Sequence, residues 1–281
     1  MGTSTSSGGS PGGAPLIPPW VPPVPPPAGL PEAGPPEAEP APPPQSPPAP
    51  PPKPELAPSG RFFGARLRLG RFAKNGSRSD LAAGLKAYTN KGLGGSQRGA
   101  ARMAGTSRTA GRLHGVLDAL RTGEALPPDV AINPTALAGR DAREIGDAIA
   151  EAIRPSDGTL DAEASRDAIA QAISDLVEQT PGVDLTALAP EQIEFVVEGY
   201  VAYDLSHRIE LDVGLAVQDK APDAAAAVSR IEDMKAYVKQ CVAASFRSAR
   251  DRGQRLTRTS AASIASAVLE ETFRVFADWL P

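Results

Sequence analysis

Proline density in the first part of the chain is the feature that most limits what this sequence can fold into. Between Pro11 and Pro58 lie 23 of the 31 prolines, and the residues among them are mostly Gly, Ser, Ala and scattered Glu. Such a stretch has too little apolar surface to offset the entropy that ordering would remove. We therefore expect residues 1–58 to form a disordered arm, and the remaining residues are numerous enough to form a domain with a sizeable core.

Apolar residues beyond residue 126 recur at the spacing of helices. Ile145, Ile149 and Ile153 form one stripe, and a similar stripe runs through residues 168–177. Asn133-Pro134 is a further start signal. Residues 127–281 are predicted to form five or six helices, the last three running from Pro190 to about Val217, from Pro222 to near Gly253, and onward from a cap at Ser260. No run has the alternation of strands, so the predicted fold class is all-α, a bundle-like multi-helix domain preceded by the arm.

Residues 59–126 form a basic segment in which glycine weakens the helical signal. Seven glycines lie between Gly92 and Gly115, and each destabilises a helix by about 1 kcal/mol relative to alanine. We expect helices over Ser77–Asn90 and Ser96–Arg121, the second with small residues that allow close helix packing. With residues 127–281, this segment is expected to form one folded unit, residues 59–281.

Charge is divided unevenly along the chain. Residues 1–58 carry a net charge of −3, residues 59–126 carry +10 and residues 127–281 carry −11. Basic side chains cluster next to Phe62, Phe63 and Phe72, at Arg61, Arg66, Arg68, Arg71, Lys74 and Arg78. The cluster predicts either nucleic-acid binding, with phosphate contacts and stacking, or docking of the segment against the acidic helices. We favour docking, because an acidic surface is available within the same chain.

Residue types that carry catalytic chemistry are sparse. His114 and His207 are far apart and lack metal-ligand neighbours at zinc spacing, so we expect both to be solvated helix residues. Cys241 lies on the apolar stripe of its helix and is expected to be a buried structural thiol. We therefore expect a protein that is not an enzyme and that holds no cofactor or metal. One cysteine, no secretory signal and no apolar run of membrane-spanning length favour a cytoplasmic location.

Gly2 is the residue of the arm best suited to modification. Removal of Met1 before a small residue would leave a free α-amine on Gly2, whose reference pKa of about 7.7–8 lies well below that of lysine. A larger fraction of this amine is therefore unprotonated near neutral pH, which makes it a good acceptor for acyl transfer.

Two stretches resemble the QatB family of bacterial Qat anti-phage operons. The first comprises Met1-Gly2-Thr3-Ser4, Ser6-Ser7-Gly8-Gly9 and Pro15-Leu16-Ile17-Pro18-Pro19-Trp20-Val21-Pro22, and the second is Asp157-Gly158-Thr159-Leu160-Asp161 before an alanine-rich helix. Such operons also encode an ATPase (QatA), a QueC-like enzyme (QatC) and a TatD-like nuclease (QatD).

The resemblance implies a partner rather than catalytic residues. QueC enzymes activate a carboxylated deazaguanine with ATP, so a QueC-like partner could present an activated acyl group to Gly2. The expected partner-binding residues of the arm are Thr3, Ser4, Leu16, Ile17, Trp20 and Val21. The expected function is a non-catalytic defence subunit that binds QatC through its arm. The alternatives are a nucleic-acid adaptor using residues 61–121 and a scaffold that spaces two partners.

Overall fold

The computed structural model describes residues 60–128, 130–137, 139–155 and 157–278, which belong to one compact unit. The arm predicted for residues 1–58, including every candidate residue in it, lies outside the described residues. The described residues contain no strand, which confirms the all-α prediction. Their nine α-helices are α1 (Phe63–Asn75), α2 (Arg78–Ala87), α3 (Ser96–Arg102), α4 (Ala104–Thr122), α5 (Ala142–Ile153), α6 (Leu160–Gln179), α7 (Pro190–Lys220), α8 (Ala224–Asp251) and α9 (Ala261–Asp278).

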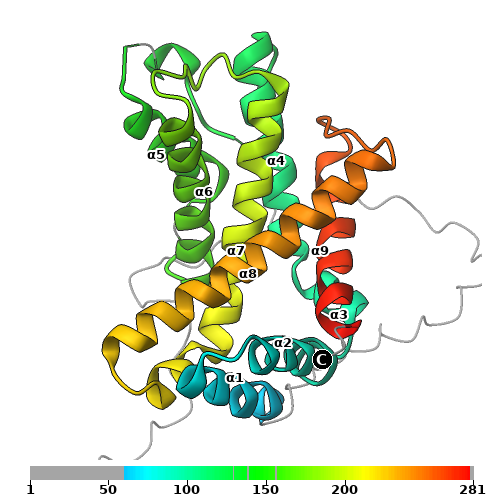
Figure 1. Ribbon diagram of the computed structural model, residues 1–281. Helices are drawn as coiled ribbons and strands as arrows, with labels where there is room; N and C mark the ends of the chain where they lie inside the picture. The colour runs from blue at the N-terminus through cyan, green and yellow to red at the C-terminus, as the bar shows by residue number, and fades with distance from the viewer. Residues whose placement is uncertain (1–59, 129, 138, 156, 279–281) are drawn as a thin grey trace, which may run out of the picture. The chain divides into compact units, whose positions relative to one another are not determined.

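Helix α7 is the centre of the described unit. It has 31 residues, about 46 Å at 1.5 Å per residue, and α1, α4, α6 and α8 all pack against it (Figure 1). Pro190, the first residue of α7, suits a helix start. Proline lacks a backbone N–H, and an N–H at this position would have no hydrogen-bond partner within the helix. Val197, Tyr200 and Leu205 are fully buried, which places the middle of α7 in the core.

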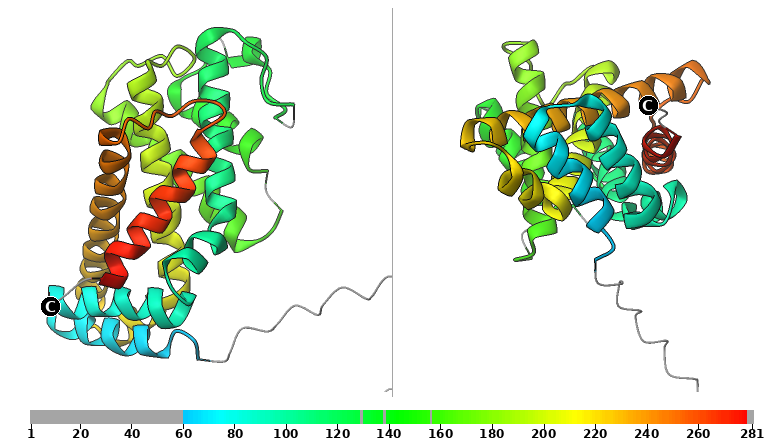
Figure 2. Two further views of the ribbon diagram at one scale, coloured as in Figure 1. Left: turned by 90° about the vertical axis from the view of Figure 1, so that its right-hand side faces the viewer. Right: turned by 60° about the horizontal axis from the view of Figure 1, so that its bottom comes forward.

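Helix α9 lies between α8 on one side and α3 and α4 on the other (Figure 2). Glycine allows this close approach. A Cβ atom added at Gly111 of α4 would lie 2.9 Å from the Cβ atom of Ala262, and one added at Gly99 would lie 2.9 Å from the ring of Phe273. The small residues of the basic segment therefore allow α3 and α4 to pack closely against α9, which agrees with the close packing predicted from these residues.

Helices α1 and α2 form a hairpin that lies crosswise at the end of α7 (Figures 1 and 2). The turn is made by Gly76, which adopts a left-handed conformation (φ 68°), and by Ser77, whose side chain accepts a hydrogen bond from the backbone N–H of Asp80. Leu69 fills the space that a side chain at Gly84 would need. The hairpin buries Phe72 and Leu85 in the common core.

Several predicted helix boundaries are confirmed and others are wrong. Residues 127–281 contain the expected number of α-helices, and α7 and α8 begin and end within a few residues of the predicted limits. The helix expected over Ser96–Arg121 is instead divided at Met103, where the turn tightens and the Met103 N–H is shared by two carbonyl groups. The helix expected over Ser77–Asn90 ends at Ala87 and continues as a π-helical turn, Tyr88–Leu93.

The start signal at Asn133-Pro134 is also followed by less helix than predicted. It opens only a short 3-10 turn, Pro134–Leu137. Helix α5 begins later because Asp141 and Glu144 form a capping box, in which each side chain accepts a hydrogen bond from the other residue's backbone N–H (2.8 and 3.3 Å). Helix α9 begins directly after Ser260, as predicted, but the Ser260 side chain accepts a hydrogen bond from the backbone N–H of Thr257 rather than from the first turn of α9.

Candidate functional site

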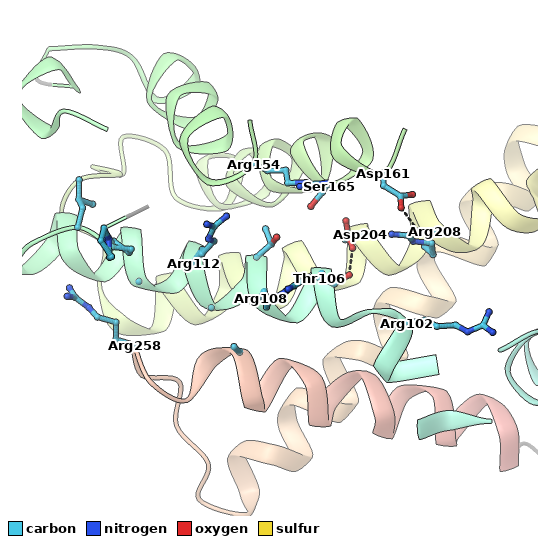
Figure 3. A pocket seen from close by; sticks show the side chains of 18 of the residues that line it. Arg102, Thr106, Arg108, Arg112, Arg154, Asp161, Ser165, Asp204, Arg208 and Arg258 are labelled. Carbon is cyan, nitrogen blue, oxygen red and sulfur yellow. Dashed lines mark hydrogen bonds and ion pairs between the residues drawn. The ribbon is translucent and has the colours of Figure 1, made fainter. Parts of the chain in front are cut away.

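A cavity of about 930 Å³ lies along one face of α4. Helices α6 and α7 supply two further walls, and the segment before α9 and residues 125–128 close one end. Its lining brings together six arginines and two carboxylates: Arg102, Arg108, Arg112, Arg154, Arg208 and Arg258, and Asp161 and Asp204. Figure 3 shows Arg112 and Arg154 extending toward the space between α4 and α6, with Arg102 and Arg258 at opposite ends.

The sequence of α4 explains why it can both pack and line a cavity. Thr106, Thr109 and Arg112 recur at helical spacing on the cavity side, together with Arg108. Beside these cavity-lining positions α4 carries apolar residues that are fully buried, among them Ala110, Leu113 and Leu117. Gly105, Gly111 and Gly115 also line the cavity, and they have no side chain that would fill the space between the arginines.

Four of the six arginines are held by neighbours. Arg208 forms an ion pair with Asp161 (2.8 Å), Arg154 with Asp157 (3.4 Å) and Arg258 with Glu124 (3.2 Å). Arg112 donates to the backbone carbonyl of Ile153 (3.3 Å). Arg102 and Arg108 have no hydrogen-bond or ion-pair partner within the part of the chain that the structure describes, and both are exposed to solvent.

A polar stripe on α7, formed by Asp204, Arg208 and Asp212, borders the cavity. These residues lie four apart and therefore share one helix face. Thr106 of α4 donates a hydrogen bond of 2.5 Å to the Asp204 carboxylate, which is buried. Burial raises the pKa of Asp204, and the Thr106 hydrogen bond and the charge of Arg208 only partly oppose that effect.

The last residue of this polar stripe connects to α1 and to the π-helical turn. Tyr88 donates to the Asp212 carboxylate (2.8 Å), and Arg66 donates to the Asp212 backbone carbonyl (2.8 and 3.1 Å). Burial is the main cause that raises the pKa of Asp212. A second cavity of about 270 Å³ lies here, lined by Arg61, Tyr88 and Asp212, and Arg102 and Arg208 line both cavities.

The family model described as Qat anti-phage system associated protein QatB matches residues 94–276, well over half of the chain. The chain belongs to the QatB family. Membership connects it with the Qat anti-phage system. No curated protein and no solved structure matches the chain. The region matched by the QatB family model begins just before α3 and ends within α9, so it contains every residue that lines the larger cavity.

The predicted basic cluster is dispersed rather than brought into the larger cavity. Arg66 contacts α7 through Asp212, and the guanidinium of Arg61 lies 4.5 Å from the centre of the Phe62 ring. Arg66 is exposed despite this contact, and so are the four cluster residues Arg68, Arg71, Lys74 and Arg78. Phe62 and Phe72 are buried, whereas Phe63 is 69% exposed. The choice between docking and nucleic-acid binding for these residues remains a prediction.

The histidines are not solvated as predicted. His114 lies on the inner face of α4 and is 6% exposed, and burial lowers its pKa. His207 donates from Nδ1 to the Ala164 carbonyl (3.1 Å), and its Nε2 atom lies 3.4 Å from Asp167. Cys241 is buried on α8 as predicted, and burial raises the pKa of its thiol.

Among residues 60–278, apart from the three undescribed positions, no group of three or more His, Cys, Asp or Glu side chains could share a metal ion. None of the described helices has the length and apolar character required to cross a membrane.

Proposed function

We propose that the chain is a non-catalytic subunit of the Qat system that binds the QueC-like protein QatC through the predicted arm. The observation that carries the proposal is the match of residues 94–276 to the QatB family. In this proposal the ATPase and the TatD-like nuclease are further partners, and the complex acts in the cytoplasm. The predicted contacts of the arm are Thr3, Ser4, Leu16, Ile17, Trp20 and Val21, which lie outside the described residues.

Gly2 is the proposed modification site. Its unprotonated α-amine would attack the carbon of an activated acyl group in the partner. A C–N amide bond would form, the bond from that carbon to its activating group would break, and the amine would release a proton to solvent. An extended chain rises about 3.1 Å per residue, so the eighteen steps from Gly2 to Trp20 span roughly 55 Å. Trp20 could therefore anchor on the partner's surface while Gly2 enters an enclosed site.

The positions of the reactive side chains support binding rather than catalysis. Cys241 is buried on α8, and neither histidine lines the arginine-rich cavity. The cavity instead offers guanidinium groups, hydroxyl groups and two carboxylates, which are groups suited to recognising a ligand.

Nucleic-acid binding through residues 61–121 is the second candidate function. The observation in its favour is the exposure of four cationic side chains: Arg68, Arg71, Lys74 and Arg78. A protein that neutralises several phosphates binds nucleic acid with an affinity that falls steeply as salt rises. Binding of this kind that is lost on changing these four residues to alanine would support the adaptor over the arm.

Co-expression with QatC tests the arm directly. We expect Trp20→Ala to weaken co-purification with QatC, because aromatic anchors carry much of the binding energy in such segments, and to leave the melting temperature of the helices unchanged. Leu30→Ala, an apolar change elsewhere in the arm, is the matched control and should bind normally.

Intact mass and phage plating complete this test. Intact mass should first show that the mature chain begins at Gly2, and then a mass increase on that residue in the presence of QatC. Deletion of residues 2–10 should abolish protection from phage while the complex still assembles. Full protection by the deleted protein would end the arm proposal.

A further inference from the structure

We infer that the arginine-lined cavity beside α4 binds a phosphate-bearing small molecule of nucleotide size, with its phosphates at Arg102 and Arg108 and its hydroxyl or amino groups at Asp204. This inference does not depend on the arm or on QatC. Every lining residue of the cavity lies in the region matched by the QatB family model.

Two unpaired guanidinium groups provide the phosphate-binding positions of the site. Arg102 and Arg108 have no partner among the described residues, whereas Arg154, Arg208 and Arg258 each face a carboxylate. Arginine presents several N–H donors in a planar arrangement that matches phosphate oxygens, and such charge-assisted bonds are about twice as strong as neutral ones. An anion entering the cavity would therefore bind best at Arg102 and Arg108 without breaking an existing ion pair.

Asp204 offers the same cavity a buried hydrogen-bond acceptor, in contrast to the donors of the arginines. Its side chain is about nine-tenths buried and lines the cavity, with Thr106 bonded to one carboxylate oxygen. A carboxylate can accept up to about four hydrogen bonds, so acceptor capacity remains for a ligand. Figure 3 shows Asp204 on the α7 wall beside Thr106. A simple polyphosphate would leave this carboxyl group facing an anion, whereas the hydroxyl or amino groups of a nucleotide would donate to it.

The size and boundaries of the cavity favour a small ligand over a nucleic-acid strand. Its volume of about 930 Å³ falls within the range of about 300–1,000 Å³ typical of small-molecule sites. Carboxylates are found at both ends, with Glu124 beside Arg258 and Asp161 beside Arg208, and would repel a polyanion that extended further. No aromatic side chain lines the cavity, although aromatic stacking is the usual means of binding single strands.

Calorimetry on the full chain tests the site. The probes are the four ribonucleoside triphosphates, ADP, adenosine, inorganic triphosphate and a 12-nucleotide oligothymidylate, each at about 0.1 M salt. At least one nucleotide should bind, more tightly than inorganic triphosphate, and adenosine should not. Arg102→Ala combined with Arg108→Ala should weaken nucleotide binding at least about tenfold, because the charge-assisted bonds to phosphate are lost.

Controls separate the site from general charge effects. Arg68→Ala combined with Arg71→Ala removes the same charge from exposed positions of α1 and should change the affinity less than about twofold. Arg108→Lys keeps the charge but loses the planar donor group, so an intermediate loss is expected.

Three results would overturn the inference. These are failure of every phosphorylated probe to bind at millimolar concentration, equal weakening by the α1 control pair, and tighter binding of the oligonucleotide than of any nucleotide. Because the test uses no QatC, its failure would leave the arm proposal intact. Loss of QatC binding by Trp20→Ala would likewise say nothing about this cavity.

Discussion

Helix α1 carries Arg66, Arg68 and Arg71 within thirteen residues, whereas the cavity-facing arginines of α4, Arg108 and Arg112, stand alone among small residues. The dense set of α1 is on an outward surface, with only Arg66 bonded to α7. The sparse set of α4 faces the cavity, opposite arginines from distant parts of the chain. A high local density of arginine therefore indicated an exposed helix face, whereas the concave cationic site is made of arginines that are scattered in the sequence.

The difference follows from how each helix meets α7. Helix α1 crosses the end of α7, so its outer face has no neighbouring helix opposite it (Figure 1). Helix α4 packs against α7 and α9, and α5 and α6 stand across from its free face. Cationic side chains on α4 are consequently enclosed by other elements, and those on α1 are exposed.

Phe72→Ala tests whether α1 is an integral part of the core. The ring of Phe72 is 1% exposed, and burial of this extent predicts a loss of about 3–5 kcal/mol in the free energy of unfolding. Chemical denaturation of the full chain measures it. Phe63→Ala, on the same helix but with a 69% exposed side chain, should change stability by less than about 0.5 kcal/mol. Similar losses for the two variants would contradict the assignment of inner and outer faces of α1.

Much of the fold could be predicted because helix periodicity is a local signal. The stripe of Ile145, Ile149 and Ile153 is buried on α5, and the prolines and glycines that were used as boundaries lie near the ends of α7 and α8. The division at Met103 could not be predicted, because it follows from the packing of α3 and α4 against α9. The basic residues around His114 in the sequence favoured a solvated position, whereas the structure buries it on the inner face of α4.

The candidate site could not be predicted from local patterns. Its six arginines are spread from Arg102 to Arg258 and come together only through the packing of α4, α6 and α7. One signal was available. The buried stripe of α7 continues beyond Tyr200 with Asp204, Arg208 and Asp212, and charged residues that extend an apolar stripe indicate a polar site inside a fold. The residues that resemble the QatB family lie mainly in residues 1–22, whereas the family match covers residues 94–276.

Thr106→Val compares the polar contacts that α4 and α1 make with α7. Valine keeps the shape of threonine but removes the hydrogen bond to the buried Asp204 carboxylate, so we expect a loss of about 1–3 kcal/mol in the free energy of unfolding. Arg66→Ala removes the hydrogen bond from α1 to the Asp212 backbone carbonyl. This hydrogen bond is exposed to solvent, so its loss should lower the free energy of unfolding by no more than about 1 kcal/mol. A larger loss for Arg66→Ala would mean that α1 is held by its charges rather than by Phe72.

Asp204→Asn tests the electrostatics of the cavity wall through the pH dependence of stability. Burial raises the pKa of Asp204 in the folded protein, so the folded state holds this proton more tightly than the unfolded chain, where the pKa is about 3.9. The stabilisation from the protonated form is present below pH 3.9 and is lost as pH rises through the higher folded-state pKa. Asparagine has no such titration, and its side-chain oxygen can still accept from Thr106.

The stability of Asp204→Asn relative to the unsubstituted protein should therefore improve as pH rises from about 3.5 to 7, by about 1.4 kcal/mol for each unit by which the pKa is raised. Urea denaturation at a series of pH values measures this difference. Asp184→Asn is the matched control. Hydrogen bonds from Thr186 lower the pKa of Asp184. The stability of Asp184→Asn relative to the unsubstituted protein should therefore decrease as pH rises, and by a smaller amount because that carboxylate is exposed. If the stability of Asp204→Asn relative to the unsubstituted protein instead decreases as pH rises, Arg208 and Thr106 stabilise the ionised carboxylate more than burial penalises it. The cavity would then present a permanent negative charge beside the proposed phosphate site.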